Sequence, residues 1–228
     1  MTEPDDLAIL ALTLKVALVA TMAIVPFGLA LAWTVAQWRG RSWVKVVIEA
    51  ILAMPLVLPP TAVGIVLLML LGKDGVAGRW FEALGIELVF TWRAAALASA
   101  VMAFPLFVRS ARTAFEEIDP RLLGVARTLG DGPVGVFRRV ALPLAWRGII
   151  AGALLSFCRA LGEFGATILI AGNIPGKTQT LALAIFQRAQ SGRDADALRL
   201  VGLTSFLAIA AVCASELLSQ RRGRPFTA

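Results

Sequence analysis

Five long apolar runs dominate this sequence and restrict the folds open to it. Crossing the hydrocarbon core of a bilayer, roughly 30 Å thick, takes about 20 apolar residues in a helix. Runs close to that length cover residues 16–35, 44–71, 89–108, 149–170 and 198–218. Because an open strand would leave backbone N–H and C=O groups unpaired in lipid, each run predicts a helix. We therefore predict an all-α integral membrane protein, a single domain over residues 1–228 with five transmembrane helices.

The composition agrees with a membrane location and narrows the possible chemistry. Hydrophobic residues make up 58% of the chain and charged residues 16%, against roughly 45–50% and about 25% in soluble domains. The chain has no His, which excludes Ser-His-Asp triads, His-containing zinc sites and His-ligated haem. Only one carboxylate, that of Glu163, lies deep in an apolar run, so paired groups for acid–base catalysis are missing. We expect a non-catalytic protein with no cofactor and no bound metal.

The basic residues indicate how the chain is oriented. Its net charge is +7. With the N-terminus outside, the inner segments hold thirteen Lys and Arg residues and the outer segments eight, while Arg159 lies within the fourth run. The positive-inside rule therefore predicts an outer N-terminus and an inner C-terminus. Because these residues lie in short loops rather than along one face, we expect no nucleic-acid partner.

Prolines interrupt three of the runs. Pro26 lies in the first run, Pro105 in the third, and Pro55, Pro59 and Pro60 in the second. Each proline removes a helical hydrogen bond and bends the helix. Two interpretations stay open: the bends serve curved packing, or they mark a broken helix that lines a transport pathway.

The inner connection between the third and fourth runs, residues 109–147, carries the clearest local signals. Asp119 is a favourable N-cap and Pro120 a favourable first helical residue, and a Gly-Asp-Gly-Pro turn ends that helix. A second short helix is predicted over residues 133–139. Two short helices at the membrane face would present apolar side chains with a basic rim. That surface suits either a soluble partner or the lipid surface.

This connection resembles the cytoplasmic loop in the membrane subunits of binding-protein-dependent ABC importers, which carry the pattern E-A-A-x3-G-x9-I-x-L-P. The same spacing here reads Gly124-Val125-Ala126, then Gly130, then Val140-Ala141-Leu142-Pro143, with Gly124 in place of the Glu. The resemblance implies a two-helix coupling loop that contacts an ATPase. The residues it assigns to that contact are Asp119, Pro120, Leu123, Gly124, Val125, Ala126, Leu129, Gly130, Val136, Phe137, Val140, Leu142 and Pro143.

Residues 159–167 and 171–178 resemble the molybdate members of this family and their sulfate relatives. Residues 56–61 with Gly64, and residues 103–109, are similar to the molybdate branch in particular. The resemblance implies a type I ABC importer transmembrane domain in the bacterial inner membrane. It would form the translocation pathway for molybdate, driven by ATP hydrolysis in a partner subunit. The implied partners are a second copy in a homodimer, two cytoplasmic ATP-binding subunits and an external, periplasmic oxyanion-binding protein. The alternatives are a sulfate, thiosulfate or tungstate permease, or a stand-alone ion-coupled transporter.

Two charges within the fourth run complete the candidate pathway. Arg159 and Glu163 are four residues apart and so share one face of a helix. Intramembrane charges are costly and commonly pair. Two hypotheses stay open: a structural ion pair that fixes helix packing, or an Arg159 that supplies positive potential to a passing anion. The candidate pathway residues are Pro55, Pro59, Pro60, Arg159, Glu163 and Thr167.

Overall fold

The computed structural model describes residues 5–38 and 40–220, and its regular structure there is entirely helical. Four helical stretches are long and apolar enough to cross a membrane, and a bent helix pair supplies a fifth. The elements are α1 (Asp6–Ala36), α2 (Ser42–Val57), α3 (Pro60–Leu71), α4 (Val76–Ala83), α5 (Trp92–Glu116), α6 (Pro120–Thr128), α7 (Pro133–Val136), the π-helical turn η1 (Phe137–Ala141), α8 (Leu142–Leu161), α9 (Gly165–Ile170), α10 (Leu181–Gln190) and α11 (Asp194–Gln220).

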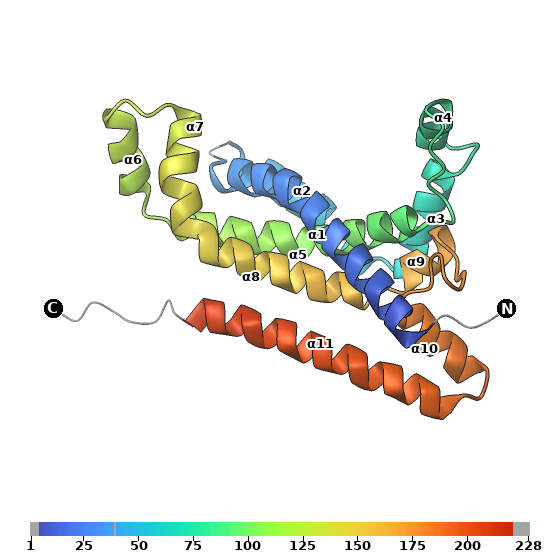
Figure 1. Ribbon diagram of the computed structural model, residues 1–228. Coiled ribbons are helices and arrows are strands. Elements are labelled where there is room, and N and C mark those ends of the chain that lie inside the picture. Colours follow the sequence, from blue (N-terminus) through green and yellow to red (C-terminus); the bar gives the residue numbers. More distant parts are fainter. Residues whose placement is uncertain (1–4, 39, 221–228) are drawn as a thin grey trace.

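Helix α5 is the centre of the bundle, with α1 and α8 packed against it most extensively. Eight of its buried residues are alanines, so neighbouring helices approach its backbone closely. At Gly28 of α1, an added Cβ would collide with the buried ring of Phe107. Figure 1 shows α6 and α7 at one end of the bundle, α3, α4 and α10 at the other, and α11 lying along one side.

The structure corrects three of the expected helix boundaries. The third run extends to Glu116, so residues 109–116 of the predicted loop belong to α5. The predicted short helix over residues 133–139 does not end there, because α7, η1 and α8 form one continuous helical stretch, Pro133–Leu161. The fourth run does not reach residue 170 as one helix, since α8 ends at Leu161 and α9 begins at Gly165.

Prolines alone do not decide where these helices break. Pro26 and Pro105 lie inside α1 and α5, which continue through them. The second run breaks instead at the tandem Pro59-Pro60, where α2 and α3 meet at 103°. A residue that precedes proline is pushed out of the helical region, and both Leu58 and Pro59 are extended, with ψ of 146° and 133°.

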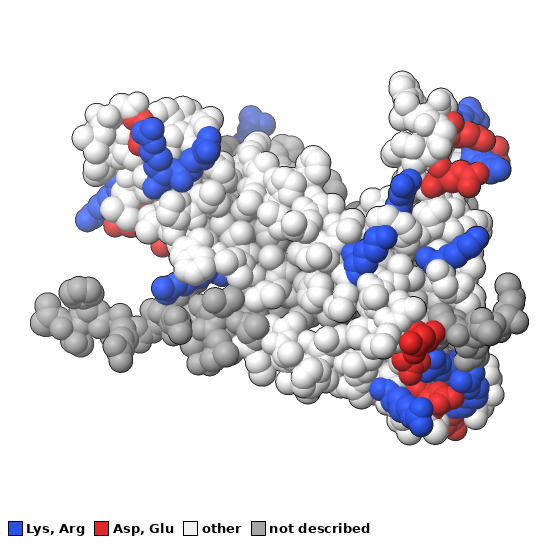
Figure 2. Space-filling model, in the orientation of Figure 1, with Lys and Arg blue, Asp and Glu red and all other residues white. Residues whose placement is uncertain are grey.

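Charged side chains gather at the two ends of the molecule. Figure 2 shows them around α6 and α7 at one end and around α4 and the α10–α11 turn at the other, with uncharged surface between. This distribution suits a protein whose middle lies in hydrocarbon. Four of the thirteen basic residues counted as inner, Arg39, Arg221, Arg222 and Arg224, lie outside the described residues.

Candidate functional site

The first part of the site is the pair of helix breaks within the membrane segments. The α2–α3 break follows from the tandem prolines, and Pro55 lies one turn earlier, inside α2. The α8–α9 break spans Gly162 to Phe164. There the ring of Phe164 packs against that of Phe186 from α10, with centroids 4.8 Å apart. This contact joins the break to α10.

The two breaks touch each other through small residues. A Cβ added to Gly165 would lie 2.7 Å from the Cβ of Pro60, far inside the usual carbon–carbon separation of about 3.5–4.0 Å. A Cβ added to Gly64 would lie 2.9 Å from the Cα of Ala166. Helices α3 and α9 therefore pack backbone against backbone at the point where each begins. Only glycine at these positions permits that approach.

Arg159 and Glu163 form an ion pair across the end of α8, with Arg159 Nη1 2.7 Å from Glu163 Oε2. The other carboxylate oxygen, Oε1, accepts the backbone N–H of Ala166 at 2.8 Å. That N–H is one of the groups at the start of α9 that has no partner within its own helix. Glu163 thus joins the end of α8 to the beginning of α9. Its side chain is 1% exposed, whereas that of Arg159 is 26% exposed.

The remaining pathway candidate, Thr167, lies in α9 and is 1% exposed. Its hydroxyl has no hydrogen-bond partner among the described residues. A buried hydroxyl without a hydrogen-bond partner costs free energy of folding, so Thr167 marks a place where the hydrogen bonding is incomplete. The structure therefore brings Pro60, Glu163 and Thr167 into one region through the contact of α3 with α9.

The second part of the site is the helix pair at the other end of the bundle. Asp119 caps α6 by accepting the N–H of Arg121 at 2.8 Å, as its N-cap position predicts. Gly130 ends the helix with φ of +95°, a left-handed conformation that glycine adopts without strain. The Asp131 N–H then returns to the Ala126 carbonyl at 3.0 Å, which fixes the turn into α7.

One side of this helix pair packs against the bundle, and the other side is exposed. Leu123, Ala126 and Val136 are buried in the same cluster as the core of α5. Phe137 packs on Trp33 of α1 and Phe115 of α5, with ring centroids 5.4 and 6.0 Å away. The opposite side exposes four large apolar side chains, Leu122, Val125, Leu129 and Val134, and Leu129 is 81% exposed. We call these four residues the exposed α6–α7 face.

The rest of the motif lies in the passage from α7 into α8. Pro143 supplies no N–H, and its ring disfavours the usual α-helical bond to the residue four positions earlier. The helix therefore adopts the wider π-helical turn η1 at this point. The N–H of Leu142 donates to the carbonyl of Phe137, five residues earlier. Gly124, which replaces the glutamate of the family pattern, has nothing within 4 Å of an added Cβ.

An ionic network between α2 and α5 was not predicted from the sequence. Arg112 pairs with Glu49 and lies 3.5 Å from Glu116 through its Nε, and Lys45 Nζ lies 2.8 Å from Glu116. The only sequence signal was charge at i and i+4 in Arg112 and Glu116. The partners on α2 are more than sixty positions away in the chain, so no local pattern reveals them.

The fold matches that of a solved transport protein. The match is to a chain in the crystal structure of a bacterial ABC transporter involved in the import of the acidic polysaccharide alginate. The superposition covers 97% of this chain and 82% of that chain, with a TM-score of 0.74 at 16% identity. This is the fold of a type I ABC importer transmembrane domain, here with the broken helices and the exposed α6–α7 face described above.

The sequence comparisons then identify the family. Residues 24–222 match the binding-protein-dependent transport system inner membrane component, and the chain belongs to that family. It is 42% identical, over 98% of its length and 99% of the relative's, to the molybdenum transport system permease protein of Escherichia coli (strain K12). It is also 38% identical to the sulfate transport system permease protein of Salmonella typhimurium, over 83% of this chain and 68% of that relative. The chain is therefore a multi-pass transport component of the bacterial inner membrane.

Proposed function

We propose that this chain is the permease subunit of an ABC importer for molybdate and forms the pathway by which the anion enters the cell. The observation that carries the proposal is the 42% identity, over nearly the full length of both chains, to a molybdenum transport permease. The chain itself would carry out no chemistry, and ATP hydrolysis would take place in a partner subunit. A sulfate permease is the second candidate, supported by the 38% identical sulfate relative.

The exposed α6–α7 face is the surface proposed to receive the ATP-binding partner. Four large apolar side chains at the membrane-remote end of a helix pair would cost free energy in water, roughly in proportion to their area. Contact with a soluble subunit removes that cost. Leu123 and Ala126 of α6 are buried in the core cluster that includes α1 and α5, and Phe137 of η1 packs on Trp33 and Phe115. A displacement of α6 would therefore move α1 and α5 with it. Binding of ATP in the partner would thereby bias the bundle between two states.

The paired helix breaks are proposed as the region that opens and closes. Helix ends inside a membrane protein are tolerated where they line a cavity or pack on protein, and half-helices meet transported ions in other transporters. The partly exposed Arg159 supplies positive charge for an anion, while Glu163 limits how strongly that charge holds it. Weak binding favours passage, because a tightly bound ion would not leave. Glu163 also keeps α9 in place through the N–H of Ala166.

The complete transporter would contain two copies of this chain, two ATP-binding subunits and an external oxyanion-binding protein. A homodimer places two copies of the broken helices around one pathway. Selectivity for the anion would reside mainly in the external protein, because the fold offers only one partly exposed cation, Arg159, at the described helix breaks.

Uptake measurements test the proposal. Cells that lack other molybdate uptake systems, and that express the chain with its ATP-binding and external partners, should accumulate radioactive molybdate. Uptake should stop when the partner's ATPase is inactivated and should persist in excess sulfate. Complete competition by sulfate would favour the sulfate permease instead. Uptake that follows a proton gradient without ATP would refute the ABC mechanism.

A further inference from the structure

A cavity of about 330 Å³ lies between α2 and α5, away from the two helix breaks. Helix α5 rises about 1.5 Å per residue, so Arg109 lies roughly 26 Å and Arg112 roughly 30 Å along it from Trp92. With Trp92 at the outer boundary, both arginines reach the inner edge of a hydrocarbon core about 30 Å thick. The cavity therefore opens at the depth of the inner-leaflet headgroups.

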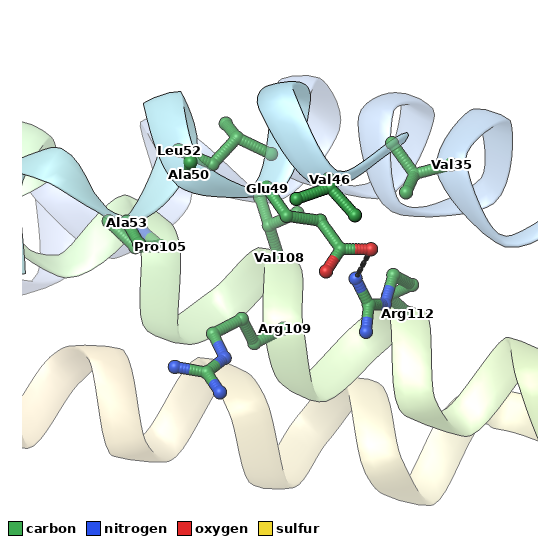
Figure 3. Close-up of a pocket in the computed structure, with 10 residues that line it drawn as sticks. All are labelled: Val35, Val46, Glu49, Ala50, Leu52, Ala53, Pro105, Val108, Arg109 and Arg112. Atoms are coloured by element: carbon green, nitrogen blue, oxygen red, sulfur yellow. Dashed lines mark ion pairs between the residues drawn. The ribbon is translucent and has the colours of Figure 1, made fainter. Parts of the chain in front are cut away.

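The charges that line this cavity are unequal. Figure 3 shows Glu49 of α2 ion-paired with Arg112 of α5, while the side chain of Arg109 extends away from that pair. The guanidinium of Arg109 has no hydrogen bond or ion pair with another described residue. The lining thus carries two positive charges and one negative charge. One unit of positive charge in the cavity lining therefore remains uncompensated.

The remaining walls of the cavity are apolar. The other seven lining residues have hydrocarbon side chains, among them Val46 and Ala50 of α2 and Val108 of α5. The cavity therefore combines one uncompensated arginine at the headgroup level with hydrocarbon walls below it. This arrangement is complementary to an amphipathic anion. Basic pockets between transmembrane helices on the cytoplasmic side bind anionic lipid headgroups for this reason.

We propose that this cavity binds the phosphodiester group of an anionic phospholipid from the inner leaflet, with Arg109 as the cation that contacts the phosphate. A phosphodiester carries one negative charge, which the net charge of the lining neutralises. A dianion such as molybdate would leave one negative charge uncompensated beside Glu49. The glycerol and the upper acyl chain would lie along Val46, Ala50 and Val108. The proposal does not depend on which anion the protein transports.

Native mass spectrometry of the full chain in mild detergent tests the proposal, with phosphatidylglycerol and phosphatidylcholine as probes. The unmodified protein should retain phosphatidylglycerol in preference to phosphatidylcholine. Arg109→Gln should weaken phosphatidylglycerol binding about tenfold, which corresponds to about 1.4 kcal/mol, and Arg109→Lys should restore much of it. Arg93→Gln is the matched control, because Arg93 is an exposed arginine at the outer end of the same helix.

Three results would overturn the proposal. Equal phosphatidylglycerol affinity in the unmodified protein and in Arg109→Gln would show that Arg109 does not hold the headgroup. Displacement of the lipid by millimolar molybdate or inorganic phosphate would assign the cavity to a free oxyanion. Lipid binding to a monomer that disappears in the dimer would show that a second copy fills the cavity. Molybdate uptake, measured separately, tests the proposed function and not this site.

Discussion

Replacing Glu163 by alanine should destabilise the protein more than any other single change at the helix breaks. The side chain is 1% exposed and makes two interactions, one with Arg159 Nη1 at 2.7 Å and one with the N–H of Ala166 at 2.8 Å. Its removal leaves both groups without that partner. Breaking a buried ion pair by removing one member costs about 3–5 kcal/mol.

The structure places the expected loss for Glu163→Ala at the lower end of that range, about 3 kcal/mol. Arg159 is 26% exposed, so water can solvate part of its charge after the partner is gone. For a protein of this size, 1 kcal/mol shifts the melting temperature by about 2–4 °C. We therefore expect Glu163→Ala to melt roughly 6–12 °C lower. Glu163→Gln keeps an oxygen that can accept the Ala166 N–H, so its loss should be less than half as large.

Melting of the purified chain in detergent, followed by tryptophan fluorescence, provides the measurement. Glu87→Ala is the matched control, because Glu87 is an exposed carboxylate with no ion pair among the described residues, and its melting temperature should change by less than about 2 °C. If Glu163→Ala melts with the unmodified protein, Glu163 does not fix the α8–α9 break. The reasoning about that break would then be wrong.

Three further changes test other parts of the structure. Gly165→Ala should cost about 1–3 kcal/mol, because its Cβ would lie 2.7 Å from Pro60; an unchanged melting temperature would contradict the close approach of α3 and α9. Gly130→Ala should cost about 1 kcal/mol through its φ of +95°, whereas Gly124→Ala, in open space, should cost nothing measurable in the same melting assay. Leu129→Ser should leave the melting temperature within about 2 °C but reduce co-purification of the ATP-binding partner at least several-fold; full retention would exclude the exposed α6–α7 face as the contact.

The sequence predicted those features that depend on local physics. Long apolar runs predicted the membrane helices, and Asp119 with Pro120 predicted the beginning of α6, because a cap acts on the residues next to it. The pairing of Arg159 with Glu163 also followed from their spacing of four residues on one helix. In each case the groups that interact are near one another in the chain.

Features that depend on distant contacts were missed. The α8–α9 break lies in a long apolar run, and two of the contacts at this break, Phe164 with Phe186 and Gly165 with Pro60, join residues that are distant in the chain. None of these pairs can be read from a local pattern. The continuation of α7 into α8 was missed for a different, local reason. A proline such as Pro143 predicts a helix end, but the wider turn η1 accommodates it.

The direct contact of the two helix breaks has a consequence for how the protein changes shape. Because Gly165 lies against Pro60 and Gly64 against Ala166, neither α3 nor α9 can tilt toward the other while that helix stays still. An arrangement with one half-helix moved into the other, and the other in place, would contain colliding backbones. Motion that brings either half-helix across this contact should therefore carry the other with it.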